Sequence, residues 1–176
     1  MRRRGIGTQV VHGHVTRNVE LTSLYEDLET AGQHPTNTLL LHAIETCPLP
    51  VAERLGIAAD AEVLHIRRLR MADGVPVAVL ENFLPRAVAP FSAEELGRHG
   101  LYQLLRARGT TMRVARQTIG ARRATNEESD LLQIDHGGPV LTVTRTAYDN
   151  SGHAVEFGEH CYRPDLYSFE VTLVDK

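Results

Sequence analysis

The chain has 176 residues, a length typical of one domain with a substantial hydrophobic core. Its apolar fraction of 42% is typical of a globular protein. Its net charge of −3 argues against a chain that binds nucleic acid through an overall positive charge. No apolar run is long enough for a transmembrane helix, and the basic start lacks the apolar core of a signal peptide. We therefore expect a cytoplasmic protein with no membrane partner. Cys47 and Cys161 follow no disulfide or metal spacing.

The first clearly patterned segment is LTSLYEDLETAG. The preceding residues 1–20 are polar and weakly patterned, so we expect an exposed lead-in there. Apolar side chains then recur at helical spacing, which predicts a helix within residues 21–32. Thr22 or Ser23 is suited to cap the start of this helix, and Gly32 is suited to end it.

Alternating apolar residues and turn signals dominate the rest of the chain. The ADG tripeptide at 72–74 and the segment at 150–152 predict two β-hairpins. Expected strands cover residues 36–46, 62–72, 75–85, 111–122, 137–150, 152–163 and 166–174, and expected helices cover residues 50–57, 92–100, 101–109 and 125–134. These elements predict an α+β fold with a mostly antiparallel sheet of about six strands and helices on one face.

The strand before the ADG turn places two arginines where buried side chains are expected. Arg68 and Arg70 continue the apolar face of VLHIRRLRM, because residues two apart in a strand point the same way. A buried guanidinium needs a partner. The two arginines therefore either form ion pairs, for example with Glu81 on the return strand, or face a cavity that holds an anion.

Other polar residues have both a structural and a functional interpretation. Thr22 and Ser23 can cap a helix, or they can hold an anion with hydroxyl groups and free backbone N–H groups. Glu156 is either an outward acid of its strand or an acid that lines a cavity. Tyr102 and Tyr167 are either core aromatics or the polar-tipped walls of a pocket.

No catalytic or metal-binding constellation stands out in the sequence. The GIGT segment at 5–8 lacks the preceding strand and the following lysine of a phosphate loop. The pair His12 and His14 has no third or fourth ligand at a usable spacing. We therefore expect no metal, no cofactor and no catalytic residue.

Five segments, in their order and spacing, resemble a known family. They are LTSLYEDLETAGQHPT, RLRMADGVPVAV with its strand-ending LP, LYQLLRARG, the A-T-x-x-E-x-x-L-L pattern at 124–132, and AVEFGEHCYRPDLYSF. Together they are similar to the UTRA domain, the effector-binding half of GntR-type transcription regulators of the histidine-utilisation-repressor branch. The resemblance covers residues 20 to about 175.

This resemblance implies a domain organisation and a function. Residues 20–176 would form the effector-binding domain, and residues 1–19 a linker and the remnant of a DNA-binding wing, which RGIGTQVV resembles. The implied fold is that of chorismate lyase, and the implied assembly is a homodimer that contacts DNA only through an N-terminal winged helix-turn-helix missing from this chain. The implied function is allosteric control of a repressor by a small anionic metabolite: a sugar phosphate, a phosphonate or an organic acid.

The resemblance also assigns ligand contacts. Family members that bind phosphorylated amino sugars use a Leu-Thr-Ser at a helix start, an Arg-x-Arg before the hairpin, two tyrosines and an acid. In this chain the matching ligand-binding residues are Leu21, Thr22, Ser23, Arg68, Arg70, Tyr102, Glu156 and Tyr167.

Two positions depart from the family pattern. Gly100 replaces a serine near the helix tyrosine, and Leu80 replaces an acid expected to meet the amino or hydroxyl groups of a sugar. The sequence thus retains the residues expected to hold the anion and changes the residues expected to contact the sugar. The alternative functions are a chorismate-lyase-like enzyme, which no visible acid–base pair supports, and a dimerisation domain without a ligand.

Overall fold

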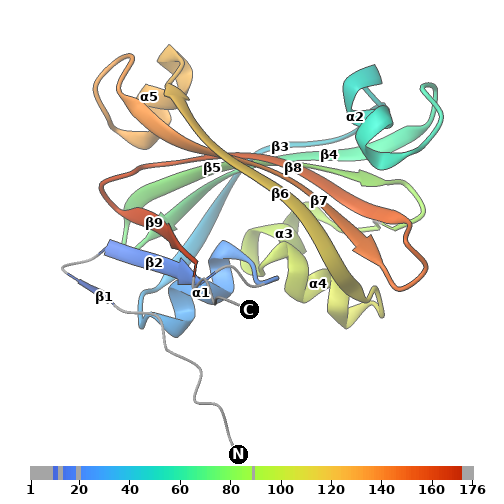
Figure 1. Cartoon of the computed structure of the whole chain (residues 1–176), viewed down its shortest axis with the longest axis horizontal. Helices are drawn as coiled ribbons and strands as arrows, with labels where there is room; N and C mark the ends of the chain where they lie inside the picture. Colours follow the sequence, from blue (N-terminus) through green and yellow to red (C-terminus); the bar gives the residue numbers. More distant parts are fainter. Residues whose placement is uncertain (1–9, 12–13, 19–20, 89, 172–176) are drawn as a thin grey trace, which may run out of the picture.

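The computed structural model describes residues 10–11, 14–18, 21–88 and 90–171 of the chain. In this part the chain forms a six-stranded sheet, a separate three-stranded sheet and five short helices (Figure 1). The expected wing remnant falls mostly in residues 1–9, which lie outside the described residues, as does His12 of the histidine pair.

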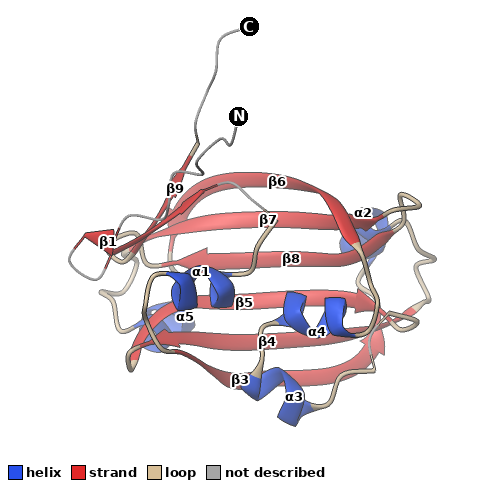
Figure 2. Ribbon diagram, turned by 90° about the horizontal axis from the view of Figure 1, so that it is seen from below, coloured by secondary structure: helices blue, strands red, loops and turns tan. Residues whose placement is uncertain are grey.

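The large sheet is antiparallel throughout and has the strand order β3-β4-β5-β8-β7-β6. Its strands are β3 (Pro35–Thr46), β4 (Glu62–Ala72), β5 (Val75–Pro85), β6 (Met112–Arg123), β7 (Pro139–Asp149) and β8 (Ala154–Tyr162). The two predicted hairpins, β4–β5 and β8–β7, lie side by side in the middle of the sheet (Figure 2). The predicted α+β class and the six-stranded antiparallel sheet are confirmed.

Local sequence explains the sharp turn between β4 and β5. Asp73 and Gly74 both have positive φ angles, of 49° and 80°. Two successive residues at positive φ match the right-handed twist of a hairpin, and Asp-Gly is a sequence that adopts them readily.

Three helices cover one face of the sheet, which we call the inner face: α1 (Leu24–Thr30), α3 (Ala93–Arg98) and α4 (Leu101–Ala107) (Figure 1). The other two, α2 (Leu49–Leu55) and α5 (Asn126–Leu132), lie at opposite ends of the outer face. There α2 packs against Phe83 and Phe157, and α5 packs against Val79 and Cys161. The expectation of helices on one face only is therefore wrong, because helix patterns do not reveal which side of a sheet a helix will cover.

Capping boxes fix the starts of three helices. Ser23 accepts a hydrogen bond from the N–H of Glu26, and Glu26 accepts one from Ser23, so Ser23 is the cap of α1. Thr125 and Glu128 form the predicted box at α5. These local signals explain why the helix starts could be located from sequence.

The small sheet consists of β1 (Val10–Val11), β2 (His14–Asn18) and β9 (Tyr167–Glu170). Strand β2 runs parallel to β9, with Val15 opposite Tyr167. The lead-in is therefore not a plain exposed arm, because part of it pairs with the end of the domain. Both β1 and β2 lie on the side of the large sheet that carries α1 (Figures 1 and 2).

The hydrophobic core is divided between the two faces of the sheet. On the inner face, Leu24 and Leu28 of α1 pack against Tyr162, and Leu101 and Leu105 of α4 belong to a second cluster. Within the described residues, no helix is long and apolar enough to cross a membrane.

Candidate functional site

The register of the large sheet brings polar side chains together on the inner face. Arg68 of β4 pairs with Leu80 of β5, and Leu80 pairs with His160 of β8. In the next row across the sheet, Ala78 lies between Arg70 and Tyr162. Together with α1 and α4 these strands enclose a cavity of about 30 Å³. Its lining residues are Ser23, Leu24, Arg68, Arg70, Leu80, Asn82, Leu101, Tyr102, Arg145, His160 and Tyr162.

The two arginines predicted at this face are almost completely buried. Arg68 is 2% exposed and Arg70 is 1% exposed. Arg68 donates one hydrogen bond, from Nη2 to Oδ1 of Asn82 at 2.9 Å. The guanidinium of Arg70 lies 4.8 Å from the ring centre of Tyr25. The Nε and Nη1 atoms of both arginines have no hydrogen-bond partner in the described part of the chain.

This environment disfavours the charge of both guanidiniums. Burial lowers the pKa of Arg68 to about 10, against the opposing effect of Glu156. Burial and the neighbouring Arg68 lower the pKa of Arg70 to about 9. Both side chains remain charged at neutral pH, so the cavity has two cations whose N–H groups are poorly compensated.

The ion-pair interpretation of these arginines does not fit the geometry. Glu81 lies on the outer face, where it accepts a hydrogen bond from His65 at 2.6 Å. Among the described residues, neither Arg68 nor Arg70 forms an ion pair with a carboxylate. The arrangement therefore favours the second interpretation, a cavity that accepts an anion.

A buried carboxyl group lies directly behind the cavity wall. Glu156 is fully buried and accepts hydrogen bonds from Tyr102 Oη at 3.0 Å and from Asn82 Nδ2 at 2.6 Å. Burial raises its pKa, while Asn82 and Arg145 oppose that rise. Glu156 thus orients two cavity-lining side chains.

Arg145 is the third buried arginine of the site, and its guanidinium is well supplied with partners. Its Nε and Nη2 donate to Oε1 of Gln117 at 2.8 and 2.6 Å. Its Nη1 donates to the backbone oxygen of Thr22 at 3.2 Å and to Tyr102 Oη at 3.4 Å. Arg145 therefore ties the segment before α1 to strand β6.

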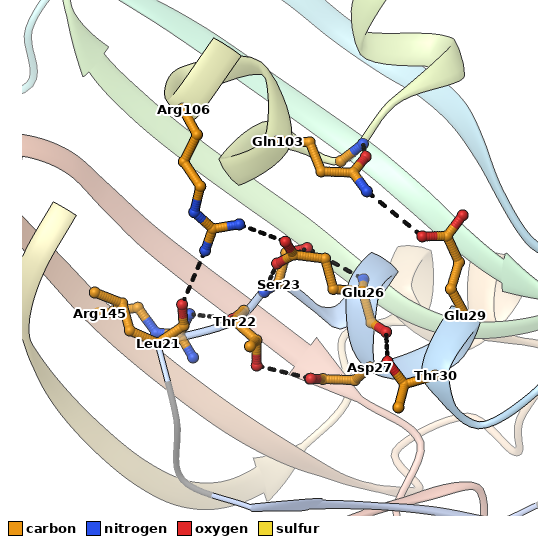
Figure 3. A network of polar contacts seen from close by, with 11 residues as sticks. Leu21, Thr22, Ser23, Glu26, Asp27, Glu29, Thr30, Gln103, Arg106 and Arg145 are labelled. Carbon is orange, nitrogen blue, oxygen red and sulfur yellow. Dashed lines mark hydrogen bonds and ion pairs between the residues drawn. The ribbon is translucent and has the colours of Figure 1, made fainter. Parts of the chain in front are cut away.

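A polar network closes the seam between α1 and α4 (Figure 3). Arg106 of α4 pairs with Glu26 and donates a hydrogen bond to the backbone oxygen of Leu21 at 3.1 Å. Gln103 donates to Glu29 at 3.4 Å. These contacts hold the start of α1 against α4, over the cavity.

The structure brings together some of the sequence-predicted ligand contacts and separates others. Ser23, Arg68, Arg70 and Tyr102 line the cavity, and Glu156 bonds to its wall. Three predicted residues lie outside the lining: Leu21, Thr22 and Tyr167.

Each of those three residues has a structural contact instead. Leu21 packs at the edge of the α4 cluster, and the Thr22 hydroxyl donates to Asp27 at 2.7 Å. Tyr167 is fully buried and stacks on Tyr162, with ring centres 4.8 Å apart.

Sequence reasoning missed several lining residues, most importantly Asn82, Arg145 and His160. Arg145 carries the same signal as Arg68, a charged residue on the apolar face of an alternating strand, here between Val143 and Ala147. The rule applied to β4, that residues two apart in a strand point the same way, would also have identified Arg145 on β7.

The described residues contain no group of three side chains suited to hold a metal ion. Both cysteines are free and buried. Nothing in this part of the chain therefore offers a metal centre, and the site consists of hydrogen-bond donors, one carboxyl group and apolar walls.

Comparison with known proteins identifies the family. The sequence matches the family description "UTRA domain" over residues 30–168. The chain belongs to the UTRA domain family. The HTH-type transcriptional repressor NagR of Bacillus subtilis is 29% identical over 170 residues, a match that covers 96% of this chain and 70% of NagR. The chain spans 65–71% of the length of the first three curated relatives, all of which are named as transcriptional regulators.

Solved structures of transcriptional regulators share the fold. A transcriptional regulator of Streptomyces coelicolor is 44% identical with a TM-score of 0.76, covering 82% of this chain and 96% of that chain. The effector domain of PhnF from Mycobacterium smegmatis is 25% identical with a TM-score of 0.83, covering 91% of this chain and 99% of that chain. The UTRA resemblance seen in the sequence is confirmed.

Proposed function

We propose that this UTRA domain is the sensing part of a GntR-type transcription regulator, most simply a repressor, and that it binds a small anionic metabolite in the inner-face cavity. The observation that carries the proposal is the pair of buried arginines, Arg68 and Arg70, with N–H groups that no atom of the described residues accepts. An anion placed between Ser23 and these guanidiniums would supply the missing acceptors and the missing charge.

The charge balance indicates the class of anion. The three buried arginines share one buried carboxyl group, Glu156, so the site has an excess of at least two positive charges, and the unfilled donors lie on Arg68 and Arg70. A phosphate, a phosphonate or a di-acid carries the matching charge near neutral pH, and a single carboxylate does not. Leu80 lies at the wall where an acid would read sugar hydroxyls, so an amino sugar is a poor match.

Binding requires a change in shape. A cavity of about 30 Å³ holds roughly two water molecules, whereas metabolite sites occupy about 300–1,000 Å³. The walls that can separate are α1 and α4, which are joined by exposed polar contacts rather than by a continuous core. An effector that fits only the separated arrangement shifts the population toward it, and this shift would be the signal passed to the DNA-binding heads.

The rest of the proposed protein follows from this assignment. Residues 20–176 form the sensing domain, residues 1–19 lead to it from a winged helix-turn-helix, and only that head contacts DNA. A regulator of this kind acts as a homodimer in the cytoplasm. The transcriptional names of the curated relatives support a role without catalysis. Release of 4-hydroxybenzoate from chorismate by the purified chain would overturn that part.

A thermal-shift screen tests the binding proposal. The chain is heated with sugar phosphates, phosphonates and organic acids, and a ligand at a hundred times its Kd should add about 2.7 kcal/mol, which is several degrees in Tm. The variant Arg68→Met/Arg70→Met should fold and lose this shift. The control Arg67→Met changes the same strand on its outer face and should keep the shift. A ligand that stabilises all three proteins equally would contradict the proposed site.

A further inference from the structure

Tyr25, in the first turn of α1, lies over one of the two buried arginines of the cavity. The guanidinium carbon of Arg70 is 4.8 Å from the centre of the Tyr25 ring. The negative face of an aromatic ring attracts a cation, and it does so more strongly where water is excluded. Arg70 is 1% exposed, so this contact is desolvated. Tyr25 is not among the residues that line the cavity, so its ring covers the guanidinium from outside that space.

A glycine lets α1 reach this position. Gly100 is the N-cap residue of α4, with a φ angle of −68° that any residue can adopt. A Cβ atom there would lie 3.1 Å from Tyr25 Cβ and 3.3 Å from Ser23 Oγ. These distances are shorter than ordinary van der Waals contacts, so a side chain at this position would push the start of α1 away from α4.

Glycine is a weak start for helix α4, which this close approach explains. Three other helices, α1, α3 and α5, begin at a side-chain oxygen that accepts a hydrogen bond from the first turn: Ser23, Ser92 and Thr125. Gly100 offers no such oxygen to α4. Serine is a better N-cap residue than glycine, so a serine here would improve the start of α4 but would separate α4 from α1.

The buried charge of Arg70 makes the closed position of α1 a balance of two effects. Water would hydrate this guanidinium if α1 moved away, and its Nε and Nη1 atoms have no partner within the described residues, so its burial favours opening. The Tyr25 ring moves with α1 and is lost as a partner when α1 opens, so the cation–π contact favours the closed position.

We propose that Tyr25 is the latch that holds α1 closed over Arg70, and that Gly100 is the position that allows this latch to close. The inference rests on the proposed sensing function for its meaning, because the latch would determine how often the cavity opens to an anion. Binding in the separated arrangement breaks the contact, and the anion then replaces the ring as the partner of Arg70.

Arginine modification tests the latch without a ligand. Phenylglyoxal labels accessible guanidinium groups, and peptide mass spectrometry gives the rate at each arginine. We expect Tyr25→Leu, which keeps an apolar side chain without a ring, to raise the rate at Arg70 about tenfold, a factor that corresponds to the loss of a desolvated cation–π contact. Gly100→Val should also raise this rate, since the new side chain pushes α1 outward.

Matched controls separate the latch from a general loosening of the domain. Tyr148→Leu removes a half-buried tyrosine beside α2 and should leave the rate at Arg70 unchanged. An unchanged rate at Arg70 in Tyr25→Leu would overturn the latch, and an unchanged rate in Gly100→Val would overturn the role of the glycine. A rise of equal size at Arg67, on the outer face, would overturn both. If Gly100→Val fails to fold, Gly100→Ala replaces it, with a smaller rise expected.

Inorganic phosphate separates this inference from the proposed function. In the opened variants, phosphate at the anion site should slow the labelling of Arg70, because it occupies the same guanidinium. Faster labelling that phosphate does not slow would leave the latch intact and contradict the anion site. Labelling that is no faster in the variants would overturn the latch, whatever phosphate does in the unchanged chain.

Discussion

At the scale of single residues, Gly158 is the position where the site tolerates least change. A Cβ atom there would lie 2.5 Å from His160 Nε2, 2.7 Å from Glu156 Oε1 and 3.0 Å from Asn82 Nδ2. Three polar side chains thus occupy the space that any other residue would need. The glycine allows the buried carboxyl group and its donors to meet above the strand.

Gly158→Ala should therefore lower the free energy of unfolding by about 1–3 kcal/mol, since the polar cluster must shift to admit a methyl group. Urea denaturation measures this loss. The control is Gly97→Ala in α3, where a new Cβ meets nothing within 4 Å and a helix gains about 0.5–1 kcal/mol. Equal effects of the two substitutions would show that the cluster at Gly158 is not tightly packed.

His65 connects three strands on the outer face. Its Nδ1 and Nε2 lie 2.7 Å from Glu45 and 2.6 Å from Glu81, and its ring stacks on Phe83 with centres 4.2 Å apart. Burial alone would lower its pKa, but the bonds to Glu81 and Glu45 outweigh that effect and raise the pKa. The folded chain therefore binds this proton more tightly than the unfolded chain.

A raised pKa has a defined consequence for stability. The contribution of His65 is complete below about pH 6.5, the pKa of an unfolded histidine, and is lost as the pH rises through the higher folded pKa. Urea denaturation at about pH 6 and about pH 9 should thus show a loss of stability that is smaller in His65→Gln, which cannot be protonated. A loss of the same size in both proteins would contradict this role.

The residues of the cavity show what sequence reasoning can and cannot find. Arg68 and Arg70 were predictable, because the strand around them alternates clearly and ends in a hairpin turn. Asn82 was not, because an amide at an inner position is meaningful only after the neighbouring strands are known. The burial of Tyr167 behind Tyr162 likewise depends on the packing of α1, which no local pattern encodes.

At the scale of elements, α1 and α4 meet through polar contacts that water can reach. Arg106 is 44% exposed and its partner Glu26 is 23% exposed, so the pair contributes at most about 1 kcal/mol. Such a contact hardly changes global stability, but it lies where the proposed binding of an effector would require the cavity to open. The seam is thus suited to local separation of two short helices.

Arg106→Met should make α1 open more often. We expect amide hydrogen exchange in residues 24–30 to be about two- to fivefold faster, which corresponds to the energy of an exposed pair. The control Arg98→Met breaks an exposed pair with Glu94 inside α3 and should leave α1 unchanged. Unaltered exchange in the Arg106 variant would mean that packing alone holds α1.

Elements were predictable where their signals are local. The capping residues Ser23 and Thr125 and the Asp73-Gly74 turn each act within a few residues, so helix starts and hairpins were located correctly. The pairing of β2 with β9 joins segments at opposite ends of the domain. No sequence pattern within residues 14–18 indicates that this strand pairs with β9, which lies near the other end of the domain.

At the scale of the whole molecule, the sheet separates two environments. Its inner face carries the buried arginines, and its outer face carries charged residues between α2 and α5. The helices are distributed over both faces of this sheet, and β6 forms one of its two edges.

In the proposed sensor, the small volume of the cavity would also determine how fast the protein responds. A metabolite is larger than a space of about 30 Å³, so each binding event in the proposed sensor would wait until α1 moves away from α4. The observed association rate should then stop rising with ligand concentration and level off at the rate of opening. Response time would be set by the seam of the domain rather than by the abundance of the metabolite.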